Sequence, residues 1–459
     1  MTKKTWLGSA VSLTLLASLL AACGANGSPN GNSNSPNAGS DNAATAGGTS
    51  GAAANADASK NEPSEKPVTI NFWFPGESQV LEDYFINAAK EFEASQSHIK
   101  VNVTVLPSGA DEIDAKLNAA KLSGTYPDVF SAYLIFMGTR GALNEFADLG
   151  GYLDKWEDKS DIQESALDLG KYQGKSIGVG YFPAPEIMTY RKDFFTEAGL
   201  DPEKPPTNWE ELKADAEKLT VKDDKGNIVR AGVDVPLNNA SPFFEAFMRQ
   251  NGSPIIDEEK GVPAFADQAS TEAFEYLTDL YQLGAIPYDY QKKDTVPFVS
   301  GKSAISYLTP AAISNLLKDK PDLKDKIGFG PVLERKNHVA FTGYRLFTIG
   351  STSKLKDESW AFITFMMSKD QMWKRYKQLQ IPIVRKSLED QFIAANPAIN
   401  SVLIDYVKSG KGKPVTPFTT RYNKYIHQAY EESVTKAKPA AQALQDAQDA
   451  LIQELKTIK

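Results

Sequence analysis

Two β-forming runs, separated by a helical segment, constrain the fold of this chain more than any other feature. Val68 to Phe74 reads VTINFWF between two prolines, and residues 99–106 read IKVNVTVL with valines at alternate positions. Between the runs, apolar residues recur every three or four positions from Leu81 to Phe92, which is the pattern of an amphipathic helix. A strand, a helix and a second strand of these lengths predict a parallel βαβ unit.

The alternation continues along the chain. We expect further strands at residues 128–133, 304–308 and 341–349, and helices at 111–123, 139–147, 207–219 and 357–379, the last being one long helix or a helix pair. The 207–219 helix starts with a capping-box pattern, in which the Thr207 hydroxyl and the Glu210 carboxylate satisfy free amides. This alternation predicts an α/β fold with mostly parallel sheets. Because about 390 residues exceed what one core usually organises, we expect two lobes.

The first 22 residues have the features of an export signal. Two lysines precede an apolar run from Trp6 to Leu20, which is short for a membrane span and is followed by small residues. Leu20-Ala21-Ala22-Cys23 resembles the lipobox cut by the bacterial lipoprotein signal peptidase, and Cys23 is the only cysteine in the sequence. We therefore expect cleavage before Cys23 and acylation of its thiol, which would anchor the chain to a membrane.

Residues 24–66 have the composition of a tether. Of these 43 residues, 32 are Ala, Asn, Gly or Ser, and none is aromatic or a large aliphatic. Such a segment has no apolar area to offset the entropy of ordering, so we expect residues 23–66 to be a lipidated, disordered tether. The expected location is the extracytoplasmic face of the cell membrane, at a Gram-positive surface. The absence of other cysteines means that the exported domain has no disulfides.

Charge and motif content argue against several classes of function. With 50 basic and 58 acidic residues the chain is mildly acidic, so nucleic acid is not an expected partner. His98, His338 and His427 lack metal-ligand spacing, and residues 223–227 lack the downstream glutamate of a calcium loop and predict a hairpin turn. No nucleophile elbow or phosphate loop is present. We expect no cofactor, no metal and no enzymatic activity.

Four stretches then carry a family resemblance. They are KLNAAKLSGTYPDV (116–129), the segment 172–219 with YQGKSIGVGY and YRKDFFTEAGLDPEKPPTNWEEL, FVSGKSAISY (298–307) and FTGYRLFTI (341–349). In this order and spacing, the sequence from Val68 to Leu455 resembles the family 1 extracellular solute-binding proteins of ABC importers, the group that contains the maltose-binding protein.

This resemblance implies the type II periplasmic-binding-protein fold, with a solute cleft between two α/β lobes that close about a hinge. The chain would cross between lobes near residues 183, 343 and 392. Lobe one would comprise 67–183 plus 344–391, and lobe two 184–343 plus 392–459. The implied partners are a small solute, expected to be an oligosaccharide, and an ABC transporter permease, with the receptor itself a monomer.

A physical rule points to the cleft independently of the family. In open parallel sheets, ligands bind beyond the carboxyl ends of the strands, which are here residues 74–78, 133–137 and 181–186. The predicted ligand contacts drawn from these loops and from positions matching the family are Trp73, Glu77, Tyr133, Tyr181, Phe182, Glu186, Tyr307, Tyr344, Arg345 and Tyr422. Glu77 can accept hydroxyl protons or cap the following helix, and Trp73 can equally be a core residue. Aromatic faces suit the C–H faces of sugars.

One departure from the family leaves the solute open. Many sugar-binding members carry Gly-Pro-Trp after the strand at 298–307, and the indole stacks on a pyranose. This chain has Thr309-Pro310-Ala311 instead, so a maltose-like binding mode is in doubt. Two other functions remain open: a ligand-sensing lipoprotein that feeds a signalling partner, and a secreted glycan-acting enzyme.

Overall fold

The computed structural model describes residues 66–258, 260–285 and 297–457. The predicted signal segment 1–22, Cys23 and the tether up to residue 65 lie outside them. The strands are β1 (Val68–Pro75), β2 (Ile99–Leu106), β3 (Val129–Tyr133), β4 (Lys171–Tyr172), β5 (Lys175–Ser176), β6 (Val179–Pro185), β7 (Ile187–Arg191), β8 (Val221–Lys222), β9 (Ile228–Val233), β10 (Ile256–Asp257), β11 (Val262–Pro263), β12 (Ser303–Leu308), β13 (Ile327–Phe329), β14 (Ala340–Ile349) and β15 (Gly410–Lys411).

The helices are α1 (Gln79–Ser95), α2 (Ala110–Ser123), α3 (Leu134–Ala142), α4 (Gly150–Lys155), α5 (Glu164–Asp168), α6 (Lys192–Glu197), α7 (Trp209–Leu219), α8 (Ser241–Gln250), α9 (Gln268–Gly284), α10 (Pro310–Asp319), α11 (Lys356–Met366), α12 (Lys369–Leu379), α13 (Glu389–Ala395), α14 (Pro397–Lys408), α15 (Thr419–Val434) and α16 (Ala440–Thr457). Within the described ranges, no helix has both the length and the apolar character that crossing a membrane requires.

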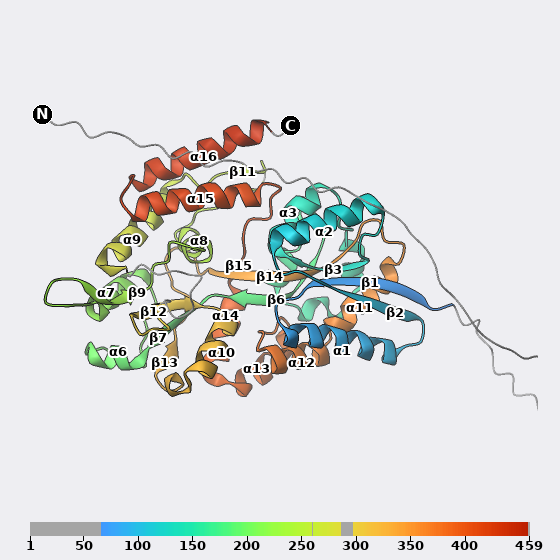
Figure 1. Cartoon of the computed structure of the whole chain (residues 1–459), viewed down its shortest axis with the longest axis horizontal. Coiled ribbons are helices and arrows are strands. Elements are labelled where there is room, and N and C mark those ends of the chain that lie inside the picture. The colour runs from blue at the N-terminus through green and yellow to red at the C-terminus, as the bar shows by residue number, and fades with distance from the viewer. Residues whose placement is uncertain (1–65, 259, 286–296, 458–459) are drawn as a thin grey trace, which may run out of the picture. The chain divides into compact units, whose positions relative to one another are not determined.

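The first sheet has the strand order β15-β14-β3-β1-β2, and β6 is a third partner of β14, outside this order. The expected βαβ unit is confirmed, because β1 and β2 pair in parallel from Val68–Ile99 to Pro75–Leu106 and are joined by α1. Figure 1 shows α2 and α3 on one side of this sheet and α1, α11 and α12 on the other.

Aromatic side chains of α1 and α11 pack against those of the first sheet. Phe72 has no exposed surface, and its ring centroid lies 5.4 Å from that of Phe85 on α1 and 5.1 Å from that of Phe362 on α11. Alternate residues of β1 point to opposite faces, so Ile70, Phe72 and Phe74 share this buried side. Burial of such rings supplies most of the packing energy of an α/β lobe.

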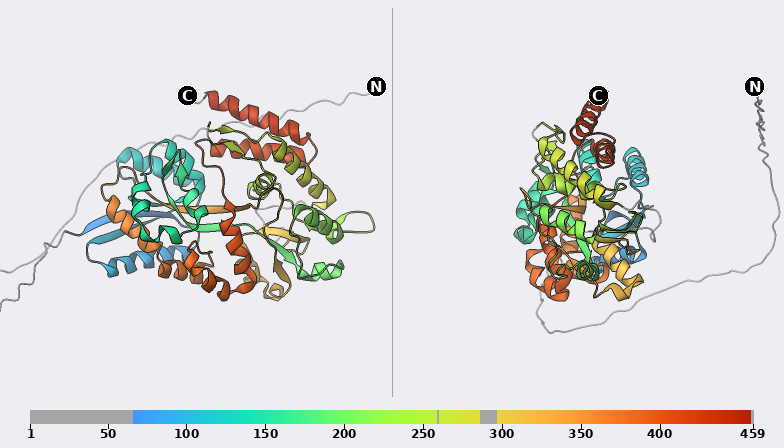
Figure 2. Two further views of the ribbon diagram at one scale, coloured as in Figure 1. Left: turned by 180° about the vertical axis from the view of Figure 1, so that it is seen from behind. Right: turned by 90° about the vertical axis from the view of Figure 1, so that its left-hand side faces the viewer.

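The second sheet has the order β13-β7-β12-β9-β8, and α7 and α9 pack against β9. Helices α15 and α16 lie side by side and contact α9 (Figures 1 and 2). Among the described strands of this sheet, only β9 and β12 pair in parallel, whereas β12/β7, β13/β7 and β8/β9 are antiparallel. The expectation of mostly parallel sheets is therefore right for the first sheet and wrong for the second. Strand β7 enters directly from the first sheet and runs against β12 and β13, and β8 and β9 form a hairpin around residues 223–227.

Two paired strands connect the sheets. β6 belongs to the first sheet, β7 to the second, and Glu186 is the single residue between them. β14 returns the chain to the first sheet and pairs with β6 from Thr342–Pro185 to Phe347–Val179. The two-lobed fold class is confirmed, whereas the residue-level lobe boundaries remain a prediction.

The β6/β14 ladder contains one irregularity. Arg345 pairs with Phe182, but the next residue of β14, Leu346, pairs with Gly180, so Tyr181 is an extra residue that forms a β-bulge. The Arg375 side chain of α12 is fully buried, and its Nη2 donates a hydrogen bond of 2.7 Å to the carbonyl oxygen of Tyr181. The bulged carbonyl is therefore satisfied by a side chain rather than by the ladder.

Several local predictions can be compared directly with the structure. The helix pair within 357–379 and the hairpin turn at 223–227 are confirmed, the latter by a hydrogen bond of 2.9 Å from the Asp223 amide to the Asn227 carbonyl. The helix expected at 139–147 is wrong in its bounds, because α3 already starts at Leu134. The capping box is displaced by one residue: Asn208 is the N-cap, and its side chain accepts from the Glu211 amide.

The aromatic core under β1 generates a stability prediction. Phe72→Ala should lower the free energy of unfolding by about 3–5 kcal/mol, because it removes a fully buried ring and leaves a cavity. Urea unfolding followed by circular dichroism measures the change. The control is Val80→Ala at an exposed position of α1, which should stay within about 0.5 kcal/mol of the wild type. Equal effects of the two substitutions would contradict this description of the core.

Candidate functional site

Three of the predicted contact residues form one row across the first sheet. Tyr133 of β3 pairs with Arg345 of β14, which in turn pairs with Phe182 of β6, so the three side chains share one face. The Arg345 guanidinium carbon lies 5.1 Å from the centroid of the Tyr133 ring and 4.7 Å from that of Phe182. The arginine is thus flanked by two aromatic rings, whose faces attract a cation.

Glu77 completes this group, which we call the Glu77 cluster (Glu77, Tyr133, Phe182 and Arg345). The Glu77 carboxylate forms an ion pair with Nη2 of Arg345 and accepts a hydrogen bond of 2.5 Å from the Tyr133 hydroxyl. Burial raises the pKa of Tyr133, the Arg345 charge opposes this, and the Glu77 carboxylate adds to it, so the phenol remains a donor at neutral pH. Glu77 does not cap α1, because Ser78 holds the N-cap position.

The neighbouring part of the β6/β14 ladder has almost no side chains on the same face. Ala184 and Gly343 pair directly, and a Cβ placed on Gly343 would meet only Ala184 atoms, at 3.5 and 3.8 Å. Because alternate residues share a face, Phe182, Ala184 and Glu186 all point to this side, and all three are half-buried. We call Ala184 and Gly343 the crossover floor, a surface without large side chains between the Glu77 cluster and Glu186.

Beyond the crossover floor lies a group of polar side chains, the Lys413 recess (Glu186, Ser241, Glu245, Lys413 and Asn423). The Lys413 ammonium donates to the Ser241 hydroxyl and, at 2.7 Å, to the Asn423 side-chain oxygen, and it lies 4.0 Å from the fully buried Glu245 carboxylate. Burial lowers the pKa of Lys413, and Glu245 opposes this shift. Burial raises the pKa of Glu186 to about 8, with Lys413 opposing, so its carboxyl group is mostly protonated at pH 7.

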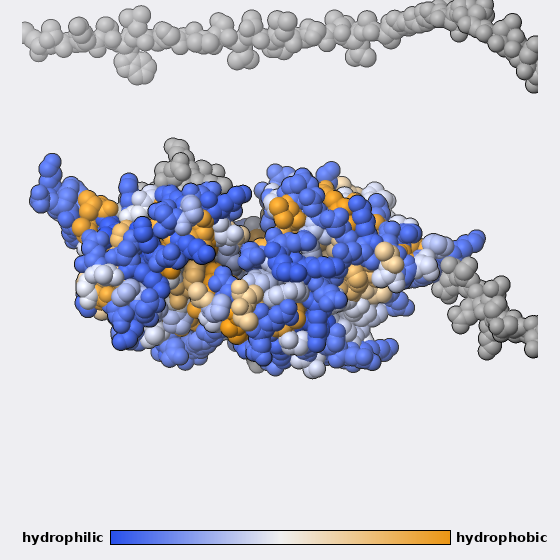
Figure 3. All heavy atoms as spheres, turned by 90° about the horizontal axis from the view of Figure 1, so that it is seen from below, coloured by the Kyte–Doolittle hydropathy of each residue, from blue (hydrophilic) through white to orange (hydrophobic). Residues whose placement is uncertain are grey.

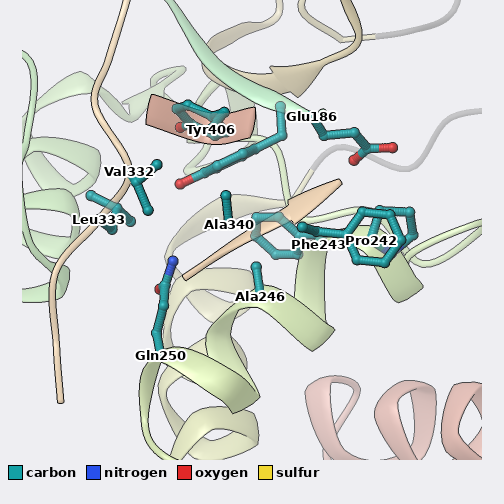
Figure 4. Close-up of a pocket in the computed structure, with 11 residues that line it drawn as sticks. Glu186, Pro242, Phe243, Ala246, Gln250, Val332, Leu333, Ala340 and Tyr406 are labelled. Carbon is teal, nitrogen blue, oxygen red and sulfur yellow. The ribbon is translucent and has the colours of Figure 1, made fainter. Parts of the chain in front are cut away.

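Tyr307 and Glu186 also border a small hollow between α8, β14 and α14. Figure 4 shows Gln250 and Ala246 of α8 on one side of it and Tyr406 on the other, with the Glu186 carboxyl group directed away from Tyr406. The Tyr307 ring packs edge-on against Phe243, with centroids 5.3 Å apart. The hollow has room for about one water molecule, so it is too small for a sugar ring.

Three of the predicted contacts are wrong because their rings lie in the core. Tyr181 is fully buried and stacks on Phe347 with centroids 3.8 Å apart, and its hydroxyl lies 2.6 Å from that of Ser131. Tyr344 is 4% exposed and points to the opposite side of β14, where its hydroxyl lies 3.2 Å from that of Ser165. Tyr422 has no exposed surface and packs edge-on against Phe265.

Trp73 is half-buried on the side of β1 opposite Phe72 and packs against the first core. This agrees with the core alternative for Trp73. Four residues of the Lys413 recess are not among those predicted from the sequence: Ser241, Glu245, Lys413 and Asn423. Ser241 and Glu245 could have been found from the rule that ligands bind beyond the carboxyl ends of strands, because α8 follows the end of β9 after a short loop. Nothing local marks Lys413 and Asn423.

Two further observations concern the polarity of the surface and the side chains that could bind a metal. Hydrophilic side chains cover most of the face shown in Figure 3, with apolar residues in separate groups. Among the described residues, no group of three or more His, Cys, Asp or Glu side chains is placed to hold a metal ion.

Glu186 generates a prediction for the pH dependence of stability. The pKa rises from 4.5 to about 8 on folding, so stability is fully present below pH 4.5 and is lost progressively as the pH rises to 8. Glu186→Gln should therefore raise the melting temperature at pH 8, and the gain in unfolding free energy there should be about a few kcal/mol at most. At pH 4.5 the substitution should leave the melting temperature nearly unchanged. Glu217→Gln, at an exposed site on α7, is the control. A melting-temperature difference independent of pH would contradict the buried position of Glu186.

Comparison with known proteins agrees with this architecture. The model of the family described as bacterial extracellular solute-binding protein matches residues 78–373. A putative binding protein of Brucella abortus is 28% identical over 301 residues, which cover 62% of this chain and 69% of the relative. The sn-glycerol-3-phosphate-binding periplasmic protein UgpB of Yersinia pestis is 24% identical, covering 54% of this chain and 57% of that protein.

Solved structures show the same fold at low sequence identity. The sugar-binding protein MalE from Xanthomonas citri has a TM-score of 0.75 at 20% identity, covering 85% of this chain and 99% of that one. The cyclic alpha-maltosyl-1,6-maltose binding protein from Arthrobacter globiformis has a TM-score of 0.73 at 21% identity, covering 85% and 100%. Since the family model spans more than half of the sequence, the chain belongs to the bacterial extracellular solute-binding proteins.

Proposed function

We propose that this protein is a lipid-tethered receptor that captures an oligosaccharide between its lobes and delivers it to an ABC transporter permease. The observation that carries the proposal is the half-buried side of the β6/β14 ladder. There the Glu77 cluster, the crossover floor and Glu186 follow one another along one strand face. Phe182 and Glu186 are four residues apart, which is about 13 Å along a strand, or the length of two to three sugar rings.

The chemistry of these groups suits a sugar. Phe182 and Tyr133 offer aromatic rings for C–H faces, and the Glu77 carboxylate, with its side chain 42% exposed, can accept hydroxyl protons beside its ion pair. A protonated Glu186 can donate as well as accept hydrogen bonds. The bare crossover floor between them leaves space for a ring at the hinge.

The comparisons support a sugar without identifying it. The two similar structures are of a cyclic alpha-maltosyl-1,6-maltose binding protein and a sugar-binding protein, and a further one of TM-score 0.73 is of a cyclo/maltodextrin-binding protein complexed with maltotetraose. Against this, UgpB is named for sn-glycerol 3-phosphate. A role in sensing, in which the loaded receptor contacts a signalling protein instead of a permease, uses the same site and stays the alternative.

Ligand capture can be tested with Gly343→Phe. The wild-type chain from residue 24 should gain thermal stability from one member of a neutral glycan panel, such as maltotetraose, mannotriose or cellotetraose, by about 2.7 kcal/mol at a hundredfold excess over the dissociation constant. Binding should also reduce the radius of gyration in X-ray scattering. Gly343→Phe fills the crossover floor, so it should abolish the response while the protein still melts cooperatively.

A matched control is Gly151→Phe, because a Cβ there meets nothing within 4 Å and the residue lies in α4, outside the predicted cleft. This variant should keep wild-type affinity. Wild-type affinity in Gly343→Phe as well would show that the solute binds elsewhere.

The membrane anchor is a separate proposal based on the sequence Leu20-Ala21-Ala22-Cys23. Cys23→Ser should leave the protein without a lipid, and it should appear in the medium or retain its signal segment. Intact mass of the membrane-extracted wild type should show cleavage before Cys23 and an added acyl mass. An unmodified wild type that is freely secreted would contradict the lipoprotein proposal and leave the solute-binding proposal standing.

A further inference from the structure

The Glu77–Arg345 ion pair joins a buried cation to a carboxylate near the surface. The side chain of Arg345 is 5% exposed, whereas that of Glu77 is 42% exposed and is borne by the loop after β1. Arg345 also donates a hydrogen bond of 3.5 Å to the Pro75 carbonyl. A buried guanidinium needs a counter-ion, because an unpaired charge in a low-dielectric site is costly. In this structure its carboxylate partner is Glu77.

The surroundings of Arg345 are those of an anion site. Its guanidinium lies between the Tyr133 and Phe182 rings, which shield it from water. The guanidinium and the Tyr133 hydroxyl both donate to the same carboxylate, one to each oxygen. Two converging donors of this kind bind the carboxylates and phosphates of ligands in many proteins. Here the anion that they hold is a side chain of the protein itself.

The cations on the other side of the crossover floor also have a carboxylate of the protein as partner. Lys413 and Arg249 both pair with Glu245, whose side chain has no exposed surface, and Glu186 adds a second carboxyl group that acts on Lys413. An incoming anion would meet guanidinium and ammonium groups that already have partners, with carboxyl groups beside them. A neutral solute with hydroxyl groups can share the remaining acceptor positions of Glu77 without displacing it.

We propose that Glu77 is a built-in counter-ion that fills the anion site formed by Arg345 and Tyr133, and that this occupancy restricts the cleft to uncharged, hydroxyl-rich solutes. The selectivity half of this proposal rests on the proposed function. Glu77 is then a specificity-determining residue, because it excludes phosphorylated and uronic solutes as well as binding neutral ones.

The first arm of the test uses inorganic phosphate and needs no knowledge of the natural solute. Glu77→Ala should bind phosphate at least about tenfold more tightly than the wild type, measured by calorimetry and by the phosphate dependence of the melting temperature. The double variant Glu77→Ala/Arg345→Gln should lose this gain. Glu82→Ala is the matched control, because it removes a carboxylate from the first turn of α1 and leaves the ion pair intact.

Should Glu77→Ala fold poorly, the recovery of its melting temperature by phosphate becomes the readout, and Glu77→Gln provides a variant of nearly native shape. A gain in Glu77→Ala that is absent from both the control and the double variant supports the anion site. Equal phosphate binding by the wild type and Glu77→Ala, or a gain that survives loss of Arg345, overturns it.

The second arm tests selectivity with trigalacturonate, glycerol 3-phosphate and the neutral glycan panel. The wild type should bind a neutral glycan and neither anion, and Glu77→Ala should shift the ratio of affinities toward the anions by about tenfold or more. A wild type that binds either anion more tightly than every neutral glycan overturns the selectivity. Binding of none of these probes by the wild type, together with a positive phosphate result, overturns the proposed sugar function and leaves the anion site in place.

Discussion

The pairing of β6 with β14 is the constraint on which the rest of the candidate site depends. Both strands connect the two sheets, and their register places Arg345 beside Phe182 and Gly343 beside Ala184. The position of Arg345 between two rings and the crossover floor next to it therefore both follow from the register of this one ladder. Arg375 of α12 supports this ladder from the core by donating to the Tyr181 carbonyl, which the bulge removes from regular pairing.

The sequence predicts the positions of the loops well, because parallel strands direct their carboxyl ends to one edge of a sheet. Glu77, Tyr133 and Phe182 were selected in this way, and the structure brings them together around Arg345. The second sheet was predicted less well. The antiparallel pairs of β7 with β12 and β13 depend on how the chain enters this sheet from the first, which is a property of the whole topology, whereas the β8/β9 pair follows from the local hairpin turn.

The error at Tyr344 has a simple physical cause. The direction of a strand side chain changes with each residue, so an error of one position moves a ring from the cleft to the core. Tyr344 and Arg345 are adjacent, yet one contacts Ser165 in the interior and the other faces Glu77. The Lys413 recess was missed for a different reason: its members come from the β6–β7 link, α8, the segment after β15 and α15, and only tertiary folding brings them together.

The bulge at Tyr181 has a consequence for how such a receptor diverges over evolution. A single-codon deletion of Tyr181 would leave Gly180 opposite Leu346 and Phe182 opposite Arg345, so the ladder would become regular without any change of register. Ala184 would keep its place opposite Gly343, but the core would lose the ring that stacks on Phe347 and the carbonyl to which Arg375 donates. Related receptors could therefore differ in the length of this strand while the Phe182 side stays in register, and an alignment that permits no gap there would compare residues that face opposite sides.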